Sequence, residues 1–304
     1  MELRRIGSLN VSVVGLGCNN FGRRLDAAGT AQVVNAALDA GINFFDTADV
    51  YGDGQSEELL GRALGSRRKE VIIASKFGYE MAGQGSGASA AYIRTAVEAS
   101  LKRLGTDTID LYQLHTPDAQ TPIAETLEAL DELVKAGKVR EIGSSNFTLA
   151  QIREAEAAVK PGAARFASLQ NEYSLLKRDD ERDVLPECER LNIGYLPYFP
   201  LASGLLTGKY RQGQALPEGT RITNNPNPSR WLTDASLATV EALIAYAETR
   251  GHSILELAFA WLLARPAVSS VIAGAMTPEQ VRANVSAAGW TLTPDDIEKV
   301  AVLL

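Results

Sequence analysis

The hydrophobic pattern of the chain alternates between short apolar runs and longer stretches in which apolar side chains recur at helical spacing. The short runs predict strands at 13–16, 44–46, 71–76, 109–114, 139–143, 168–171, 194–197 and 270–273. The longer stretches predict helices at 30–40, 56–64, 91–104, 123–136, 149–160, 182–191 and 237–264, the last broken near Gly251. Ahead of the first strand, the residues around Gly7 and Ser8 predict a hairpin.

The order of these elements predicts the class of fold. Short strands that are mostly apolar on both faces need helices that cover a parallel sheet, and eight strand–helix units in 304 residues predict a closed α/β barrel of the (β/α)8, or TIM, type. We expect one domain spanning 1–304, with an N-terminal hairpin and a long loop after strand seven. An open doubly wound sheet is the alternative. Such a sheet binds a dinucleotide with G-x-G-x-x-G after its first strand, whereas Gly15, Gly17 and Gly22 have a different spacing.

Composition and charge exclude several classes of partner. The 30 basic and 37 acidic residues leave a net charge of -7, so we expect no nucleic acid and no anionic membrane as partner. Two cysteines, Cys18 and Cys188, and two histidines, His115 and His252, are too few for a disulfide framework or a zinc cluster, so no metal is expected. No run approaches the roughly 20 apolar residues that span a bilayer, and the N-terminal residues lack an apolar signal core. These features predict a cytoplasmic location.

The segment 203–231 lacks helical periodicity and is rich in Gly, Pro and Asn. A connection of this length in a compact domain is usually functional or mobile. Its local charge is 4 - 1 = +3, from Lys209, Arg211, Arg221 and Arg230 against Glu218. The contrast with the acidic chain predicts an anion nearby, and a solvated surface loop is the alternative interpretation.

Polar side chains stand where three consecutive strands end. Asp46 closes the second strand, Lys76 closes the third and His115 follows the fourth, while Tyr51 comes five residues after Asp46. The carboxyl ends of barrel strands meet at one face, where active sites lie. Each residue alone has a structural explanation, such as a buried ion pair. Together they favour a functional site, because buried Asp and Lys cost several kcal/mol to desolvate unless they are paired.

This set of residues suits the reduction of a carbonyl group. An ammonium about 4 Å from a phenol contributes roughly 4 kcal/mol at an effective dielectric of about 20, or about 3 pKa units. We therefore expect Lys76 to bring the pKa of Tyr51 towards neutrality and Asp46 to keep Lys76 charged. His115 would donate a hydrogen bond to a substrate oxygen.

Longer motifs surround these residues. They are Gly41-Ile-Asn-Phe-Phe-Asp46-Thr-Ala-Asp-Val-Tyr51-Gly, Leu111-Tyr-Gln-Leu-His115, Gly143-Ser-Ser-Asn146-Phe147, Gln170-Asn-Glu-Tyr-Ser174, Pro200-Leu-Ala-Ser-Gly-Leu-Leu-Thr-Gly-Lys209 and Gly274-Ala-Met-Thr-Pro-Glu-Gln280. In these motifs, and in their order along essentially the whole chain, the sequence resembles the aldo-keto reductase family.

The resemblance implies a (β/α)8 barrel that binds NADPH in an extended form, with NADH as a possible substitute. It also implies a catalytic tetrad of Asp46, Tyr51, Lys76 and His115, in which Tyr51 gives the proton to a small-molecule carbonyl substrate. Two alternatives stay open. One is an alcohol or sugar dehydrogenase that runs in the oxidative direction. The other is a non-catalytic, nucleotide-sensing partner similar to potassium-channel β-like relatives, which commonly replace the histidine that this chain keeps.

By the same resemblance, the cofactor-binding residues fall along the whole chain. Ser145, Asn146 and Gln170 would hold the carboxamide of the nicotinamide, and Tyr198 would stack on its ring. The other expected contacts are Asn19, Asp46, Phe199, Pro200, Leu201, Ala202, Ser203, Gly204, Lys209, Arg221, Gly274, Met276, Gln280 and Asn284, with Lys209 and Arg221 on the phosphates. Met276 stands where many relatives have Arg or Ser for the 2'-phosphate, so the preference for NADPH rests on Arg221 and Gln280.

Two rival motifs and a set of pocket candidates complete the picture. Tyr173 and Lys177 match the Y-x-x-x-K spacing of short-chain dehydrogenases, but no glycine-rich nucleotide turn accompanies them. Ser174 with Lys177 fits S-x-x-K without the other serine-hydrolase motifs. The residues expected near the substrate opening are Asn19, Asn20, Phe77, Tyr79 and Trp231. The physiological substrate and the oligomeric state are not specified at this level.

Overall fold

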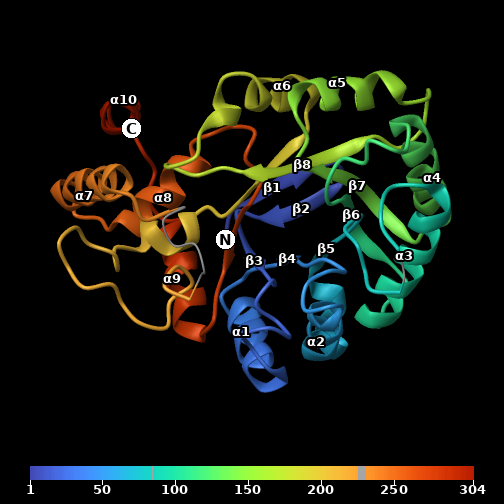
Figure 1. Ribbon diagram of the computed structural model, residues 1–304, viewed down its shortest axis with the longest axis horizontal. Coiled ribbons are helices and arrows are strands. Elements are labelled where there is room, and N and C mark those ends of the chain that lie inside the picture. The colour runs from blue at the N-terminus through green and yellow to red at the C-terminus, as the bar shows by residue number, and fades with distance from the viewer. Residues whose placement is uncertain (84, 225–230) are drawn as a thin grey trace.

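The computed structural model describes residues 1–83, 85–224 and 231–304. Its central element is a barrel of parallel strands around which helices form a ring (Figure 1). In chain order the barrel strands are β3 (Val14–Gly17), β4 (Phe44–Asp46), β5 (Ile72–Phe77), β6 (Ile109–Leu114), β7 (Val139–Ser145), β8 (Phe166–Glu172), β9 (Gly194–Tyr198) and β10 (Val271–Gly274). Each predicted strand lies within two residues of an observed one.

The barrel closes where its two outermost strands meet. The strand order is β10-β3-β4-β5-β6-β7-β8-β9, with every neighbouring pair parallel. Tyr195 in β9 donates its backbone N–H to Ala267 at 2.7 Å, and its carbonyl accepts from Ser269 at 2.9 Å, just before β10. The prediction of a (β/α)8 barrel is therefore confirmed, and the open doubly wound alternative is wrong.

The helices follow the predicted alternation through most of the chain. They are α1 (Ala27–Asp39), α2 (Gln55–Leu64), α3 (Ala90–Leu104), α4 (Ile123–Lys135), α5 (Leu149–Ala158), α6 (Val184–Leu191), α7 (Asp234–Thr249), α8 (Ile254–Leu263), α9 (Pro278–Ala287) and α10 (Pro294–Leu303), with short 3-10 helices η1 (Gly65–Glu70), η2 (Asp179–Glu181) and η3 (Ala202–Thr207).

The predicted break near Gly251 separates α7 from α8. Gly251 has a positive φ of 76°, and Ser253 caps α8 by accepting from the backbone N–H of Glu256. Helices α9 and α10 were not predicted, although Thr277 and Thr293 cap them and a Pro follows each cap. The long loop after the seventh barrel strand begins with η3 instead of irregular chain.

The N-terminal hairpin seals one end of the barrel. It consists of β1 (Leu3–Ile6) and β2 (Leu9–Ser12), paired antiparallel as predicted. Ile6, Leu9 and Val11 are fully buried in the same cluster as the barrel-interior residues Phe44 and Leu111. With the amino-terminal end of the barrel closed in this way, its carboxyl-terminal end is left for a site.

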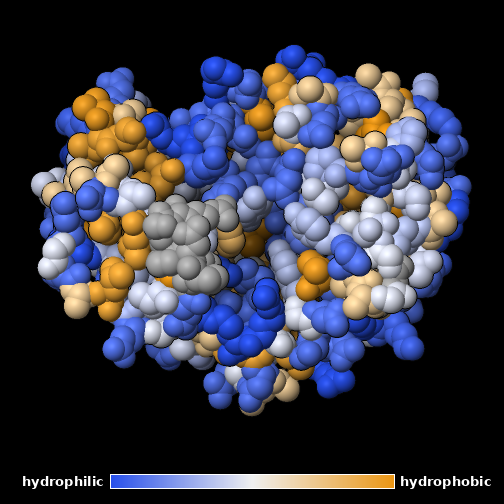
Figure 2. Space-filling view, viewed as in Figure 1, coloured by the Kyte–Doolittle hydropathy of each residue, from blue (hydrophilic) through white to orange (hydrophobic). Residues whose placement is uncertain are grey.

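The carboxyl-terminal face of the barrel is hollowed near its centre. Figure 2 views the molecule from this face and shows a hollow surrounded by largely hydrophilic residues. No helix of the described residues is long and apolar enough to cross a bilayer.

Candidate active site

A cavity of about 780 Å³ opens at the carboxyl ends of the barrel strands. Most of the predicted site residues line it: Asn19, Asp46, Tyr51, His115, Ser145, Asn146, Gln170, Tyr198, Phe199, Pro200, Leu201, Ser203, Gly204, Lys209, Arg221, Gly274, Met276, Gln280 and Asn284. Lys76 and Ala202 are the exceptions, since both are buried outside the lining of the cavity. The structure thus brings residues from both halves of the chain to one site.

Lys76 and Asp46 form a buried ion pair between β5 and β4. The ammonium of Lys76 is fully buried and donates to Asp46 Oδ2 at 2.7 Å and to the carbonyl of Thr47 at 2.8 Å. Asp46 Oδ1 accepts from Gln170 Nε2 at 2.9 Å. These bonds fix the direction of the ammonium and compensate its desolvation.

Tyr51 lies beside this pair. The Lys76 ammonium is 5.1 Å from the centroid of the Tyr51 ring, and the His115 ring meets that ring edge to face at 5.7 Å. Burial raises the pKa of Tyr51 above its usual value, although the charge of Lys76 opposes this. The expectation that Lys76 brings the pKa of Tyr51 towards neutrality is therefore wrong for the ligand-free protein, because desolvation of the phenolate outweighs the ammonium. Tyr51 keeps its proton at neutral pH.

His115 is a neutral imidazole at the wall of the cavity. Burial, and then the charge of Lys76, lower its pKa well below the usual value. Its Nδ1 is buried without a hydrogen-bond partner, and its ring also contacts Tyr79 at 4.6 Å between centroids. Asn146 Nδ2 donates to the His115 carbonyl at 2.9 Å and holds its backbone in place. A neutral ring in this position can offer one N–H to a ligand.

Amide and hydroxyl groups form the wall next to these residues. Ser145 Oγ donates to the carbonyl of Gln170 at 2.7 Å, and Asn146 Nδ2 also reaches Ser145 Oγ at 3.2 Å. The hydroxyl of Tyr198 donates to Asn146 Oδ1 at 2.8 Å. Donors and acceptors of this kind, held by one another, suit a planar amide ligand.

The loop after β9 combines a strained backbone with an unpartnered hydroxyl. Phe199, Ala202 and Ser203 have φ angles of 50°, 45° and 58°, a left-handed conformation that non-glycine residues rarely adopt. Ser203 Oγ is buried, lines the cavity and has no hydrogen-bond partner. An unsatisfied buried hydroxyl in a strained loop is explained by a ligand that accepts its hydrogen bond.

Three cations line the cavity near this loop. Partial burial lowers the pKa of Lys209 and of Arg221, and the charge of Arg24 lowers both further. No ion pair of the described residues joins an acidic side chain to any of the three. Of the predicted basic loop, only Lys209 and Arg221 face the cavity, because Arg211 pairs with Glu241 at 2.7 Å. Arg230 lies outside the described residues.

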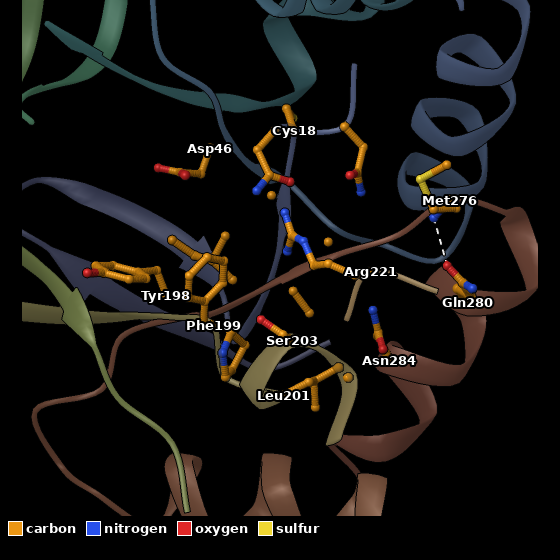
Figure 3. Close-up of a pocket in the computed structure, with 18 of the residues that line it drawn as sticks. Cys18, Asp46, Tyr198, Phe199, Leu201, Ser203, Arg221, Met276, Gln280 and Asn284 are labelled. Atoms are coloured by element: carbon orange, nitrogen blue, oxygen red, sulfur yellow. Dashed lines mark hydrogen bonds between the residues drawn. The ribbon is translucent and has the colours of Figure 1, made fainter. Parts of the chain in front are cut away.

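The two ends of the cavity differ in chemistry. Figure 3 shows Met276, Gln280 and Asn284 at one end and Asp46 at the other, with Arg221 between them. Gln280 Oε1 accepts from the backbone N–H of Met276 at 2.7 Å, so only the amide NH₂ of Gln280 is left to donate. The three labelled side chains at this end, Met276, Gln280 and Asn284, carry no charge.

Other sequence expectations have mixed outcomes. Asn19, Asn20 and Tyr79 line the cavity, but Phe77 and Trp231 do not. Phe77 is fully buried and stacks on Tyr112 at 4.8 Å, because successive side chains of β5 point to opposite faces and Lys76 takes the inner one.

The rival motifs do not form a site. The Tyr173 hydroxyl donates to Glu181 at 2.8 Å and Lys177 pairs with Asp179, and neither residue lines the cavity. Sequence reasoning missed Arg24. Its position in the loop after the first barrel strand was the available signal, since such loops build the active face.

The barrel, the buried Lys–Asp pair and the phenol at the cavity define an oxidoreductase of the aldo-keto reductase class. A family model described as the Aldo/keto reductase family matches residues 13–304, and the chain belongs to this family.

Several named proteins are similar to the chain. It is 38% identical to the Aldo-keto reductase YhdN of Bacillus subtilis (strain 168), over 97% of this chain and 91% of that protein. It is 36% identical to a probable voltage-gated potassium channel subunit beta of Oryza sativa subsp. japonica, over 100% of this chain and 97% of that protein. The solved structure of the glycerol dehydrogenase AKR11B4 from Gluconobacter oxydans has a TM-score of 0.86 and 33% identity, and covers 100% of this chain and 95% of its own.

Proposed function

We propose that the protein reduces an aldehyde or ketone to an alcohol with NADPH, and that NADH is a possible substitute. The observation that carries the proposal is the phenol of Tyr51, which lines the cavity between the Lys76 ammonium and the neutral His115 ring. A reduced nicotinamide, when bound, supplies the hydride.

The residues present fit such a cofactor. The unpartnered Ser203 hydroxyl and the cations Lys209 and Arg221 suit a diphosphate, which needs donors and positive charge. Ser145, Asn146 and Gln170 would hold the carboxamide, and Tyr198 the ring. The adenosine would lie against the neutral end of the cavity, at Gly274, Met276, Gln280 and Asn284.

Each residue expected near the carbonyl group of the substrate has a separate role. The N–H of His115 donates to the carbonyl oxygen and positions it. Tyr51 then gives its proton to the oxygen as negative charge develops there, and its raised pKa keeps the proton in place until that moment. Lys76 stabilises the phenolate that remains, and Asp46 keeps Lys76 oriented.

The reverse reaction is the second candidate. The same groups oxidise an alcohol if Tyr51 acts as the base, and the likeness to a glycerol dehydrogenase favours testing it. The likeness to a channel subunit beta raises the non-catalytic alternative, but all four predicted catalytic side chains are present and assembled.

Tyr51→Phe tests the proposal. Loss of the proton donor should lower kcat about 10²- to 10⁴-fold, while fluorescence quenching shows unchanged cofactor binding. Tyr79→Phe is the matched control, because Tyr79 also touches the His115 ring, and it should keep activity within a few-fold of the wild type. The assay follows oxidation of NADPH and NADH with a panel of carbonyl compounds, and reduction of NADP⁺ and NAD⁺ with alcohols. Equal rates for Tyr51→Phe and the wild type would remove Tyr51 from this role.

A further inference from the structure

Asp49 lies at the middle of the turn that carries two of the tetrad residues. Asp46 ends β4 and Tyr51 stands just before α2, so the turn between them sets the place of the phenol. Backbone bonds attach this turn to β5, from Thr47 N–H to Ala74 at 2.8 Å and from Asp49 N–H to the carbonyl of Lys76 at 3.1 Å. A displacement at Asp49 therefore acts directly on the spacing of Tyr51 and Lys76.

The side chain of Asp49 is buried and only half satisfied. The residue is 1% exposed; its Oδ1 accepts from the Val50 N–H at 2.6 Å, and its Oδ2 has no hydrogen-bond partner. A charged oxygen that is shielded from solvent and has no donor is far more costly to bury than a neutral carboxyl group. The geometry therefore favours the protonated acid.

The groups that face Asp49 add to the free-energy cost of ionising its carboxyl group. Glu57 of α2 is fully buried, and its carboxylate accepts from Ser75 Oγ at 2.5 Å and from Arg103 Nε of α3 at 2.7 Å. The nearby arginine is thus committed to Glu57. The ammonium of Lys76 on β5 is committed to Asp46 and Thr47.

Two phenols complete the surroundings of Asp49, Tyr92 of α3 and Tyr112 of β6. The hydroxyl of Tyr112 is buried without a hydrogen-bond partner. Burial, followed by repulsion from Glu57, raises the pKa of Asp49 to about 7.

We propose that Asp49 is a positioning residue whose proton keeps the turn between β4 and α2 in its catalytic place, and whose ionisation displaces that turn away from Glu57 and misaligns Tyr51. The idea rests on the proposed function only for its activity readout. The pKa of Tyr51 and that of Lys76 are raised above their usual values, and the pKa of His115 is lowered well below its usual value. None of these three shifts moves a titration towards neutral pH. A change of rate near neutral pH that disappears in Asp49→Asn would therefore report Asp49.

The experiment is a pH profile of kcat for carbonyl reduction by the full chain, with Asp49→Asn as the test variant. If the ionised form is inactive, wild-type kcat should fall about 30-fold between about pH 6 and pH 8.5, following the protonated fraction of an acid with a pKa of about 7. Asp49→Asn should match the wild type at the lower pH and stay flat. Asp53→Asn makes the same change on an exposed residue of the same turn and should keep the wild-type profile.

A second variant guards against misfolding of the first. Glu57→Gln removes the repelling charge and leaves Arg103 unpaired, so the fall in kcat should move to lower pH by about one unit. A wild-type profile in Asp49→Asn, or no shift in Glu57→Gln, would overturn the proposal. Urea unfolding of the ligand-free protein, compared between the wild type and Asp49→Asn at both pH values, reports the proton without catalysis. If the protein reduces no carbonyl compound but its unfolding still depends on pH in the way that Asp49→Asn removes, the proposed function fails, while protonation of Asp49 in the folded protein is established.

Discussion

Replacing Lys76 by Met tests the buried pair that organises the site. Met preserves most of the apolar length of the side chain but removes the ammonium. It leaves Asp46 Oδ2, on a side chain that is 5% exposed, and the Thr47 carbonyl without their donor. Removing one partner of a buried pair costs about 3–5 kcal/mol, because the other charge stays buried and unpaired. Asp46 keeps its bond from Gln170, so we expect a loss at the lower end of this range.

The double variant Asp46→Asn with Lys76→Met separates the charge from the shape. Since Asn carries no charge, the double variant should be more stable than Lys76→Met alone by about 2 kcal/mol. Urea unfolding followed by far-UV circular dichroism measures both differences. Both variants should be inactive in carbonyl reduction, because the phenolate of Tyr51 loses its stabilising cation. If the single and double variants unfold at the same urea concentration, the reasoning about the pair is refuted.

Three further predictions concern the cofactor end and Asp49. Lys209→Ala and Arg221→Ala should each weaken NADPH binding about tenfold or more in fluorescence titration. Arg211→Ala should not weaken it, because Arg211 is already paired with Glu241. Equal weakening by all three variants would contradict the assignment of Lys209 and Arg221 to the cofactor phosphates. Ser203→Ala should change the free energy of unfolding of the ligand-free protein in urea by no more than about 1 kcal/mol, because the Ser203 hydroxyl has no partner to lose. The same variant should weaken cofactor binding a few-fold. Unchanged binding would exclude the hydroxyl as a contact of the cofactor. For Asp49, burial and then repulsion from Glu57 raise the pKa from its ordinary value of 3.8 to about 7 in the folded protein, so the folded state holds the proton more tightly. The stabilising effect of this proton, about 4 kcal/mol, is complete below about pH 4 and is lost as the pH rises to about 7. Asp49→Asn should abolish that slope in urea unfolding, and a persisting slope would assign it to another group.

The strands and most helices could be predicted because the buried face of each element determines the spacing of apolar residues along the sequence. A barrel strand is covered on both sides, so the six residues of 109–114 are all buried and most of them are apolar. Burial does not account for every helix. Helices α9 and α10 were missed, and the signal that marks them is local, a capping Thr followed by Pro at the start of each.

The residues of the candidate site that stand at strand ends could be predicted from the sequence. The features that depend on loop conformation or on burial were missed. Asp46 and His115 follow from the ends of apolar runs. Arg24 and the pairing of Arg211 with Glu241 depend on loop paths, which bring together residues that no spacing relates. The pKa of Tyr51 was predicted in the wrong direction because a pairwise charge can be estimated from residue types, whereas desolvation depends on the folded surroundings.

The hairpin that closes the amino-terminal end of the barrel also joins distant parts of the chain. Its Arg4 guanidinium donates to the carbonyls of Leu263 and Val268, and the Arg5 carbonyl accepts from Ser269 Oγ, all close to the last strand. These bonds join residues that lie more than 250 positions apart in the chain. Contacts of such long range form only after a large loop has closed, so we expect the joining of the hairpin to the last strand to be a slow step of folding.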